Sequence, residues 1–398
     1  MTTTILRNVR PWGGAAVDLE IDGELIAALK PYDDTRVAPE GHEVVDGQGL
    51  LALPGFINAH AHVDKSWWHR EWVPYGGERT TQGRIEHERA ERHKYGIPSV
   101  QGARTVLEEF LRHGTTAARS HVDVDLGVGL DGISMVREAS AALGDSVELT
   151  LVAFPQDGVI RRPGVLKLLD RAAAEGADLI GGLDPAGIDM DPVAQLDGLF
   201  SIAVDRSVGI DIHLHDGQNL GAFQYDLIIQ RTLDAGLQGK VNISHGFALG
   251  DAQGSRQTDL LDGLQEAGIS WTTVAPPRTS PLPWQEMLRR GIGLGLGTDG
   301  IRDLWNPFGD GDILRVALDF AKLHGLRTDE ELHDAVELAT TRAAAFVGRE
   351  VHGLAPGARA DVVLLDAENV QDALTRVPRR ELVLAAGRVM TRQGALVG

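Results

Sequence analysis

Residues 211–218 read DIHLHDGQ and begin like a buried strand, yet they carry two histidines and two aspartates. Side chains alternate between the two faces of a strand, so His213 and His215 point the same way and Asp216 lies at the edge of the next loop. Such a stretch is either a metal site or an unusual piece of core. The choice depends on what the neighbouring strands bring to the same place.

A strand pattern followed by a helix pattern repeats along the chain. From about residue 50 onward, short apolar runs alternate with amphipathic segments such as 100–114 and 312–325, which is typical of strand–helix units around a parallel sheet. Eight such units close most simply into an α/β fold of the (β/α)8 TIM barrel type, with the active site at the carboxyl ends of the strands. The predicted strands are 51–63, 115–124, 147–156, 179–185, 209–216, 240–246, 269–276 and 292–300.

The two flanks of the chain have a different pattern. Residues 1–50 contain short alternating pieces, and the tail carries ARADVVLLDA and RELVLAAGRVMTRQGAL. Both read as antiparallel strands joined by tight turns. We therefore expect both chain ends to form one small β-sandwich domain, with its first part at 1–52 and its second at 351–398, beside a barrel at 53–350.

Composition limits the kind of partner. The 398 residues carry a formal net charge of −19, which disfavours nucleic acid and anionic membranes, because both bind clusters of Lys and Arg. The absence of cysteine excludes thiolate catalysis and thiolate metal sites. The start, MTTTILRNVRPWGG, lacks the apolar core of a signal peptide, and no 18-residue apolar run is present. We expect a cytoplasmic protein that acts on a small neutral or cationic molecule.

Histidines gather at the predicted strand ends. His60 and His62, in NAHAHVDK, are two residues apart, so both imidazoles project from one face and either hold a single ion or are satisfied core histidines. His213 and His245 end two later strands. Asp299 closes the eighth strand in GLGTDG, where a lone buried carboxylate needs a partner such as an arginine or a metal. This clustering favours a metal site.

The ordered set of motifs resembles the amidohydrolase superfamily and, within it, the bacterial cytosine deaminases. These motifs span nearly the whole chain, and their order is far more specific than any one of them. The matching segments are PGFINAHAHVDK, RSHVDVD, LVAFPQDG, DIHLHDG, ISHG and GLGTDGIRDLWNPFG, with GLAPGARADVVLLDAENVQDAL in the tail.

The resemblance implies a metal centre. His60, His62 and His213 would bind one divalent metal ion, and Asp299 would complete the set and later carry a proton. His245 would hold the attacking water or the developing oxyanion. The fourth predicted strand, LIGGLDP, has no lysine, so a metal pair bridged by a carboxylated lysine is not expected. Imidazole and carboxylate ligands suit zinc first, with iron or manganese as alternatives.

The resemblance also implies substrate contacts and an assembly state. Gln156, in AFPQ, would hydrogen-bond the amide edge of a ring, and Trp305 would line that pocket. His121, Asp123 and Asp125 would support the metal ligands from behind. Because relatives form oligomers, we expect a homo-oligomer.

Three positions depart from the cytosine deaminase pattern. Asp216 stands where those enzymes keep a proton-carrying glutamate, and it is shorter by one carbon–carbon bond. Gly300 replaces an acidic residue after the metal aspartate. His215 replaces an aspartate and is a substrate contact, a replacement proton carrier or a rival metal ligand. These changes cast doubt on cytosine as the substrate.

Lys65 and the charged run after it each allow two structural interpretations. Lys65 either reaches the pocket, as an Asp-Lys pair does in triazine-degrading relatives, or pairs with a loop carboxylate. The run KSWWHREW at 65–72, continuing through RTTQGRIEHERAERH, is expected to form a solvated loop and helix. Trp67, Trp68 or Trp72 is a candidate to cap the pocket.

We therefore predict a metal-dependent hydrolytic deaminase or aminohydrolase acting on a small nitrogen heterocycle such as a pyrimidine or triazine. Two alternatives remain open at this point: a cyclic amide hydrolase that opens its ring, and a non-catalytic binding protein on the same scaffold. In the enzyme readings, Asp299, His245 and Asp216 are the catalytic candidates, and Gln156, Trp305, His215 and Lys65 are the substrate contacts.

Overall fold

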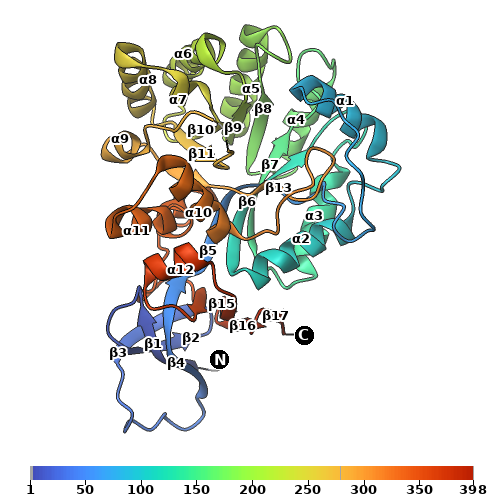
Figure 1. The fold of residues 1–398 in the computed structure, drawn as a ribbon. Coiled ribbons are helices and arrows are strands. Elements are labelled where there is room, and N and C mark those ends of the chain that lie inside the picture. Colours follow the sequence, from blue (N-terminus) through green and yellow to red (C-terminus); the bar gives the residue numbers. More distant parts are fainter. Residues whose placement is uncertain (1–2, 278, 398) are drawn as a thin grey trace.

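The computed structural model describes residues 3–277 and 279–397. Its larger part is a parallel sheet that curls round on itself, with helices on its outer side (Figure 1). In hydrogen-bonding order the strands are β12 (Leu294–Leu296), β11 (Ser270–Thr273), β10 (Val241–His245), β9 (Gly209–Leu214), β8 (Leu179–Leu183), β7 (Glu148–Phe154), β6 (Thr115–Asp123), β5 (Phe56–His62) and β13 (Asp299–Gly300).

The two edges of this sheet belong to one segment of chain. β13 pairs with β5, so that Asp299 lies opposite Ala61, and β13 is separated from β12 by residues 297–298 alone. Gly297 makes this close approach possible, because a Cβ atom there would lie 2.4 Å from the backbone oxygen of His60. The first predicted strand thereby meets the last, and the predicted α/β barrel architecture is confirmed.

Several helices, α2 (Val100–Arg112) among them, bury one apolar face against this sheet. In α2, Val106 and Phe110 are fully buried, and the hydroxyl of Ser99 caps the helix by accepting a hydrogen bond from the Gly102 amide. The described residues include no helix of the length and apolarity that a membrane crossing requires. The other helices are α1 (Thr81–Glu91), α3 (Asp131–Ala141), α4 (Val165–Ala174), α5 (Pro192–Arg206), α6 (Gln218–Asp234), α7 (Ala248–Asp251), α8 (Gly254–Glu266), α9 (Trp284–Arg289), α10 (Ile313–His324), α11 (Asp329–Glu337), the 3₁₀ helix η1 (Thr341–Val347) and α12 (Val370–Arg376).

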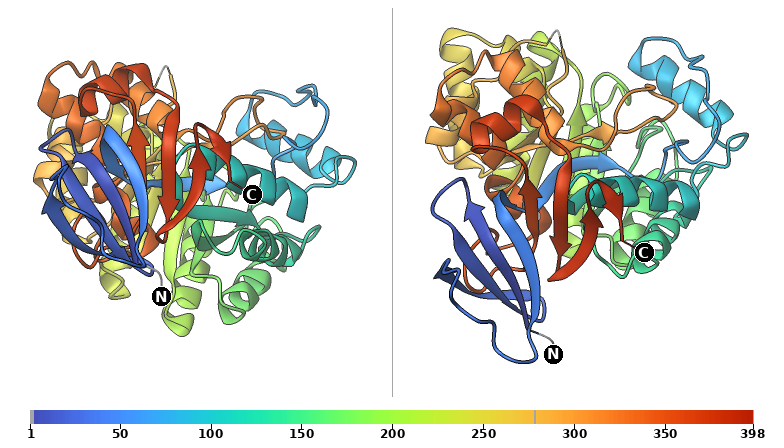
Figure 2. Two further views of the ribbon diagram at one scale, coloured as in Figure 1. Left: turned by 90° about the horizontal axis from the view of Figure 1, so that it is seen from below. Right: turned by 60° about the horizontal axis from the view of Figure 1, so that its bottom comes forward.

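Both chain ends meet in a second, mixed sheet, as predicted (Figure 2). One apolar cluster joins its two halves, with Leu6 and Leu19 from the first and Val362 and Leu384 from the second. The expectation of antiparallel pairing throughout is wrong at one place, because β1 and β4 run parallel. In hydrogen-bonding order the strands are β17 (Ala395–Leu396), β16 (Arg388–Arg392), β15 (Arg380–Ala385), β14 (Val362–Leu365), β4 (Glu43–Pro54), β1 (Thr3–Pro11), β2 (Val17–Asp22) and β3 (Leu25–Pro31).

The predicted strand 51–63 divides at Gly55 between the two sheets, since β4 ends at Pro54 and β5 begins at Phe56. A Cβ atom on Gly55 would lie 2.3 Å from Oγ1 of Thr116, so the crossing needs glycine. His352 contacts the chain at this crossing between the two sheets, which we call the joint. Its Nε2 donates a hydrogen bond to the Gly55 carbonyl oxygen at 2.8 Å, and its Nδ1 accepts one from Arg349 at 3.1 Å.

This joint makes stability depend on pH. Burial, together with the charge of Arg349, lowers the pKa of His352 to about 4. The unfolded chain binds the proton with a pKa near 6.5, so the contribution of neutral His352 is complete above that pH and is lost as the pH falls toward 4. The unfolding free energy of wild type should fall when the pH is lowered from 7 to 4.5. In His352→Gln, which keeps a donor and an acceptor but does not titrate, this fall should be smaller by about 2 kcal/mol. Urea unfolding at both pH values measures this, and equal losses in the two proteins would contradict it.

Candidate metal centre and substrate pocket

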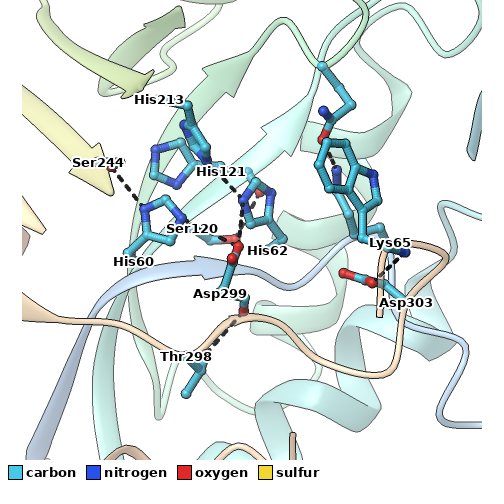
Figure 3. A network of polar contacts seen from close by, with 12 residues as sticks. His60, His62, Lys65, Ser120, His121, His213, Ser244, Thr298, Asp299 and Asp303 are labelled. Carbon is cyan, nitrogen blue, oxygen red and sulfur yellow. Dashed lines mark hydrogen bonds and ion pairs between the residues drawn. The ribbon is translucent and has the colours of Figure 1, made fainter. Parts of the chain in front are cut away.

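The predicted metal ligands converge at the carboxyl ends of the barrel strands (Figure 3). Oδ1 of Asp299 lies 3.6 Å from Nε2 of His60 and 3.4 Å from Nε2 of His62. Nε2 of His62 in turn lies 3.3 Å from Nε2 of His213. Strands β5, β9 and β13 thus aim donor atoms from distant parts of the sequence at one point.

A further histidine joins this group. His121, at the end of β6, has its ring centroid 4.4 Å from that of His60 and 4.6 Å from that of His213. Burial lowers the pKa of His121 to about 4, although Asp211, with Oδ1 3.4 Å from Nε2 of His121, opposes the shift. Each of His60, His62, His121 and His213 places a ring nitrogen within 4.8 Å of the others, a spacing that suits a shared metal ion.

The chemistry of these donors fits a cation. Burial lowers the pKa of His62, His213 and His245 well below its ordinary value, so these rings are neutral at pH 7. Neutral imidazole is the form that binds metals. Among the described residues, Nε2 of His60 and Nε2 of His245 are buried without a hydrogen-bond partner. Neutral nitrogens that face a carboxylate in this way are the donor set of a zinc-type site.

Residues behind the histidines fix their orientation. The Oγ atom of Ser244 on β10 lies 3.0 Å from Nδ1 of His60, which leaves Nε2 of that ring facing Asp299. Ser244 donates to Oδ1 of Asp211 at 2.6 Å, and Arg119 pairs with the other oxygen of Asp211 at 3.0 Å. Partners of this kind set the tautomer and angle of a metal-binding histidine.

Asp299 is held ionised at the edge of the pocket. Its side chain is 34% exposed, and burial of the rest favours the neutral form, but the adjacent imidazoles of His60 and His245 outweigh this and keep the pKa of Asp299 well below the usual range. Its backbone φ of 61° lies in the left-handed region, which is uncommon for a residue other than glycine. The side chain of Asn58 accepts a hydrogen bond from the preceding Thr298 amide at 3.1 Å and supports this turn.

A cavity of about 670 Å³ opens above these groups. It has room for a ring of the size of a triazine or pyrimidine with a substituent. His60 lies beneath it, in contact with Asp299, and Asp216 does not reach it. The other predicted site residues all line it: His62, Lys65, Gln156, His213, His215, His245, Asp299 and Trp305.

Lys65 points into the site and does not pair in a surface loop. Its Nζ atom donates to Oε1 of Gln156 at 2.6 Å and to Asp123 at 2.8 Å. Asp64 accepts a hydrogen bond from the Asp123 amide. Burial raises the pKa of both Asp64 and Asp123 to about 7, and their mutual repulsion adds to the shift at Asp64. The predicted role of Asp123 in supporting the site therefore includes holding Lys65 against Gln156.

The stretch DIHLHDGQ divides between two environments. Nδ1 of His215 lies 2.8 Å from Oδ2 of Asp184, and its ring stacks on His245 with centroids 4.5 Å apart. Asp216 instead turns away and accepts hydrogen bonds from the Gly187 amide at 2.9 Å and from the Gln224 amide group at 3.0 Å. The structure thus brings His215 into the pocket and leaves Asp216 outside it.

Sequence reasoning did not single out several residues of this site. Asp184 follows the apolar run of β8 directly, and that position was its only signal. Phe247 lines the pocket beside His215, at 6.3 Å between ring centroids. Neither Trp67 nor Trp72 caps the pocket, because Trp67 is buried beneath the loop that carries Trp305 and Trp72 is 63% exposed.

The family model that describes the amidohydrolase family matches residues 90–391. This chain belongs to the amidohydrolase family. It is similar to the solved N-isopropylammelide isopropylaminohydrolase of Burkholderia multivorans ATCC 17616, with 40% identity, complete coverage of both chains and a TM-score of 0.94. It is also similar to the N-isopropylammelide isopropyl amidohydrolase of Pseudomonas sp. (strain ADP), with 29% identity over 96% of this chain and 94% of that one. The 5-methylcytosine deaminase of Klebsiella pneumoniae shares the fold, with 23% identity, complete coverage of both chains and a TM-score of 0.83.

The donor set predicts how metal is held. We expect the purified chain to bind about one divalent ion, and His213→Asn or Asp299→Asn to reduce this to about a tenth or less, because each removes a convergent donor. Mass spectrometry of the metal content after dialysis measures the stoichiometry. His333→Asn, on the partly exposed face of α11, is the matched control and keeps the full content. Unchanged metal content in both site variants would contradict this assignment.

Proposed function

We propose that this chain is a metal-dependent aminohydrolase that removes an amine from a substituted triazine or a related nitrogen heterocycle. The observation that carries the proposal is the placement of the His60–His62–His213–Asp299 cluster at the floor of a pocket walled by Lys65, Gln156 and Trp305. The similar proteins named for N-isopropylammelide support the same substrate class.

One divalent ion, with zinc as the first candidate, would be held by His60, His62, His213 and Asp299. Such an ion supplies Lewis-acid activation of water at neutral pH. Asp299, ionised and facing the pocket, accepts the proton of the attacking water at its free carboxylate oxygen. His245 lies on the same floor and orients that water through Nε2.

His215 and Asp184 provide the second proton transfer. Asp184 binds Nδ1 of His215, which leaves Nε2 as the free nitrogen of a ring that lines the pocket. Burial alone would lower the pKa of His215, but the charge and hydrogen bond of Asp184 raise it, which favours the protonated ring that can donate to a leaving amine. This pair takes the role that the glutamate has in cytosine deaminases, because Asp216 does not reach the pocket.

The opposite wall binds the ring. Since Lys65 occupies Oε1 of Gln156, the amide of Gln156 presents its N–H groups, which suit a ring carbonyl oxygen. Trp305 offers an aromatic face for stacking. Phe247, Val274 and Pro276 also line the pocket and give the side near His215 an apolar character, which favours an alkylamine over ammonia as the leaving group.

Turnover of N-isopropylammelide tests the function directly. We expect isopropylamine release by the metal-loaded protein, and a loss of at least about 10²- to 10⁴-fold in kcat for Asp299→Asn, because both the proton acceptor and a metal donor are removed. Mass detection of the amine measures both. No amine or ammonia release from any triazine or pyrimidine in a panel would overturn the proposal, and addition of water without loss of an amine would favour ring opening.

A pair of adjacent substitutions tests the proton carrier. His215→Asn should lower kcat by about 10²-fold or more, whereas Asp216→Asn should remain within about threefold of wild type. The reduction in His215→Asn should be smaller for substrates whose amine leaves more readily, since they need less protonation. The opposite ranking of the two variants would assign the proton transfer to Asp216.

A further inference from the structure

A carboxylate from outside the barrel reaches the wall of the pocket. Glu88 lies on α1, in the charged run expected to form a solvated helix, yet its side chain is only 2% exposed. Its Oε1 atom lies 3.5 Å from Nζ of Lys65, and its Oε2 atom accepts a hydrogen bond from Nε1 of Trp305. The two oxygens of one carboxylate thus contact two predicted substrate-binding residues.

Charge balance does not explain this burial. Lys65 already has Asp123 at 2.8 Å, and Asp64 lies next to Asp123, so Glu88 adds a third buried carboxyl group around one ammonium. Burying an extra carboxylate costs free energy unless it makes specific contacts. Both partners of Glu88 are donors, and a carboxylate can accept from both at once, whereas the amide nitrogen of a glutamine cannot accept.

Helix α1 also does not depend on Glu88 for its position. Arg92, the residue at its carboxyl end, forms two hydrogen bonds to Asp125 at 2.5 and 2.8 Å. Arg89 pairs with Asp157 at 2.5 Å, and Ile85 packs against the Phe154 and Trp305 cluster. These contacts hold α1 against the loops that follow β6 and β7 and leave Glu88 free to act on the pocket wall.

Resting on the proposed function, we propose that Glu88 is a positioning residue that sets the substrate-binding wall by holding Lys65 against Gln156 and turning the Trp305 ring toward the cavity. Through Lys65 it fixes which end of the Gln156 amide faces the substrate. Through Trp305 it fixes the plane on which the ring stacks. The wall therefore takes its residues from the loops after β5, β7 and β13, and Glu88 on α1 contacts two of them.

The test compares Glu88→Ala and Glu88→Gln with Glu86→Ala, whose side chain lies on the exposed face of the same helix. Two quantities are measured on the metal-loaded protein: KM and kcat for N-isopropylammelide, and the Kd of cyanuric acid, the ring that remains after loss of the amine, by calorimetry. We expect Glu88→Ala to raise KM and Kd about tenfold with kcat within about threefold, since charged hydrogen bonds to the wall are lost. Glu88→Gln should fall between Glu88→Ala and wild type in KM and Kd, because its single acceptor oxygen can keep only one of the two contacts. Glu86→Ala should match wild type.

A double substitution shows whether Glu88 acts through Lys65. In a Lys65→Met background, Glu88→Ala should raise Kd by clearly less than it does alone, because part of its effect is already lost. Fully additive effects, or an unchanged KM and Kd in Glu88→Ala, would overturn the inference. If the wild type binds the ring without releasing an amine, the proposed function fails while the Kd comparison still decides the role of Glu88.

Discussion

The pairing of β13 with β5 is the constraint on which the rest of the structure depends. It closes the curled sheet, and the same pairing brings Asp299 beside His60 and His62. Gly297 permits this pairing because it has no Cβ atom, which would lie too close to the backbone of His60. Because barrel closure and assembly of the donor cluster occur at one place, a larger side chain at Gly297 would disturb both together. The candidate metal centre is therefore part of the line along which the barrel closes and is not an addition to its surface.

Around that line, the site uses buried charge in two opposite ways. On the histidine side, burial keeps the rings neutral so that their nitrogens are free to act as ligands. On the other side, burial concentrates carboxyl groups around Lys65, which orders the wall that faces the substrate. One half thus gathers neutral rings around the single carboxylate of Asp299, and the other gathers several carboxyl groups around one ammonium. In the proposed function, this asymmetry separates the group that would activate water from the groups that would orient a ring.

The sequence allowed the barrel and the donor set to be predicted because both leave local signals. Each strand is a short apolar run, and His60, His62, His213 and Asp299 stand at strand ends, where parallel strands converge. Asp216 was misleading for the same reason: its position in the sequence fits the pocket, but a contact with Gly187, distant in the sequence, turns it away. Nothing in the sequence indicated that Glu88 is buried, because its neighbours are charged and its burial depends on Lys65 and Trp305 from elsewhere in the chain. The parallel pairing of β1 with β4 likewise follows from tertiary packing and not from alternation.

The position of β4 in the mixed sheet bears on how the chain is made. β4 leads directly into β5, the first strand of the barrel, but one of its two neighbours is β14, which begins at Val362. During synthesis, every strand of the barrel has been translated before β14 emerges, so one edge of β4 stays unpaired through most of translation. A chain that stops before β14 would have a nearly complete barrel and an open sheet edge next to the first barrel strand.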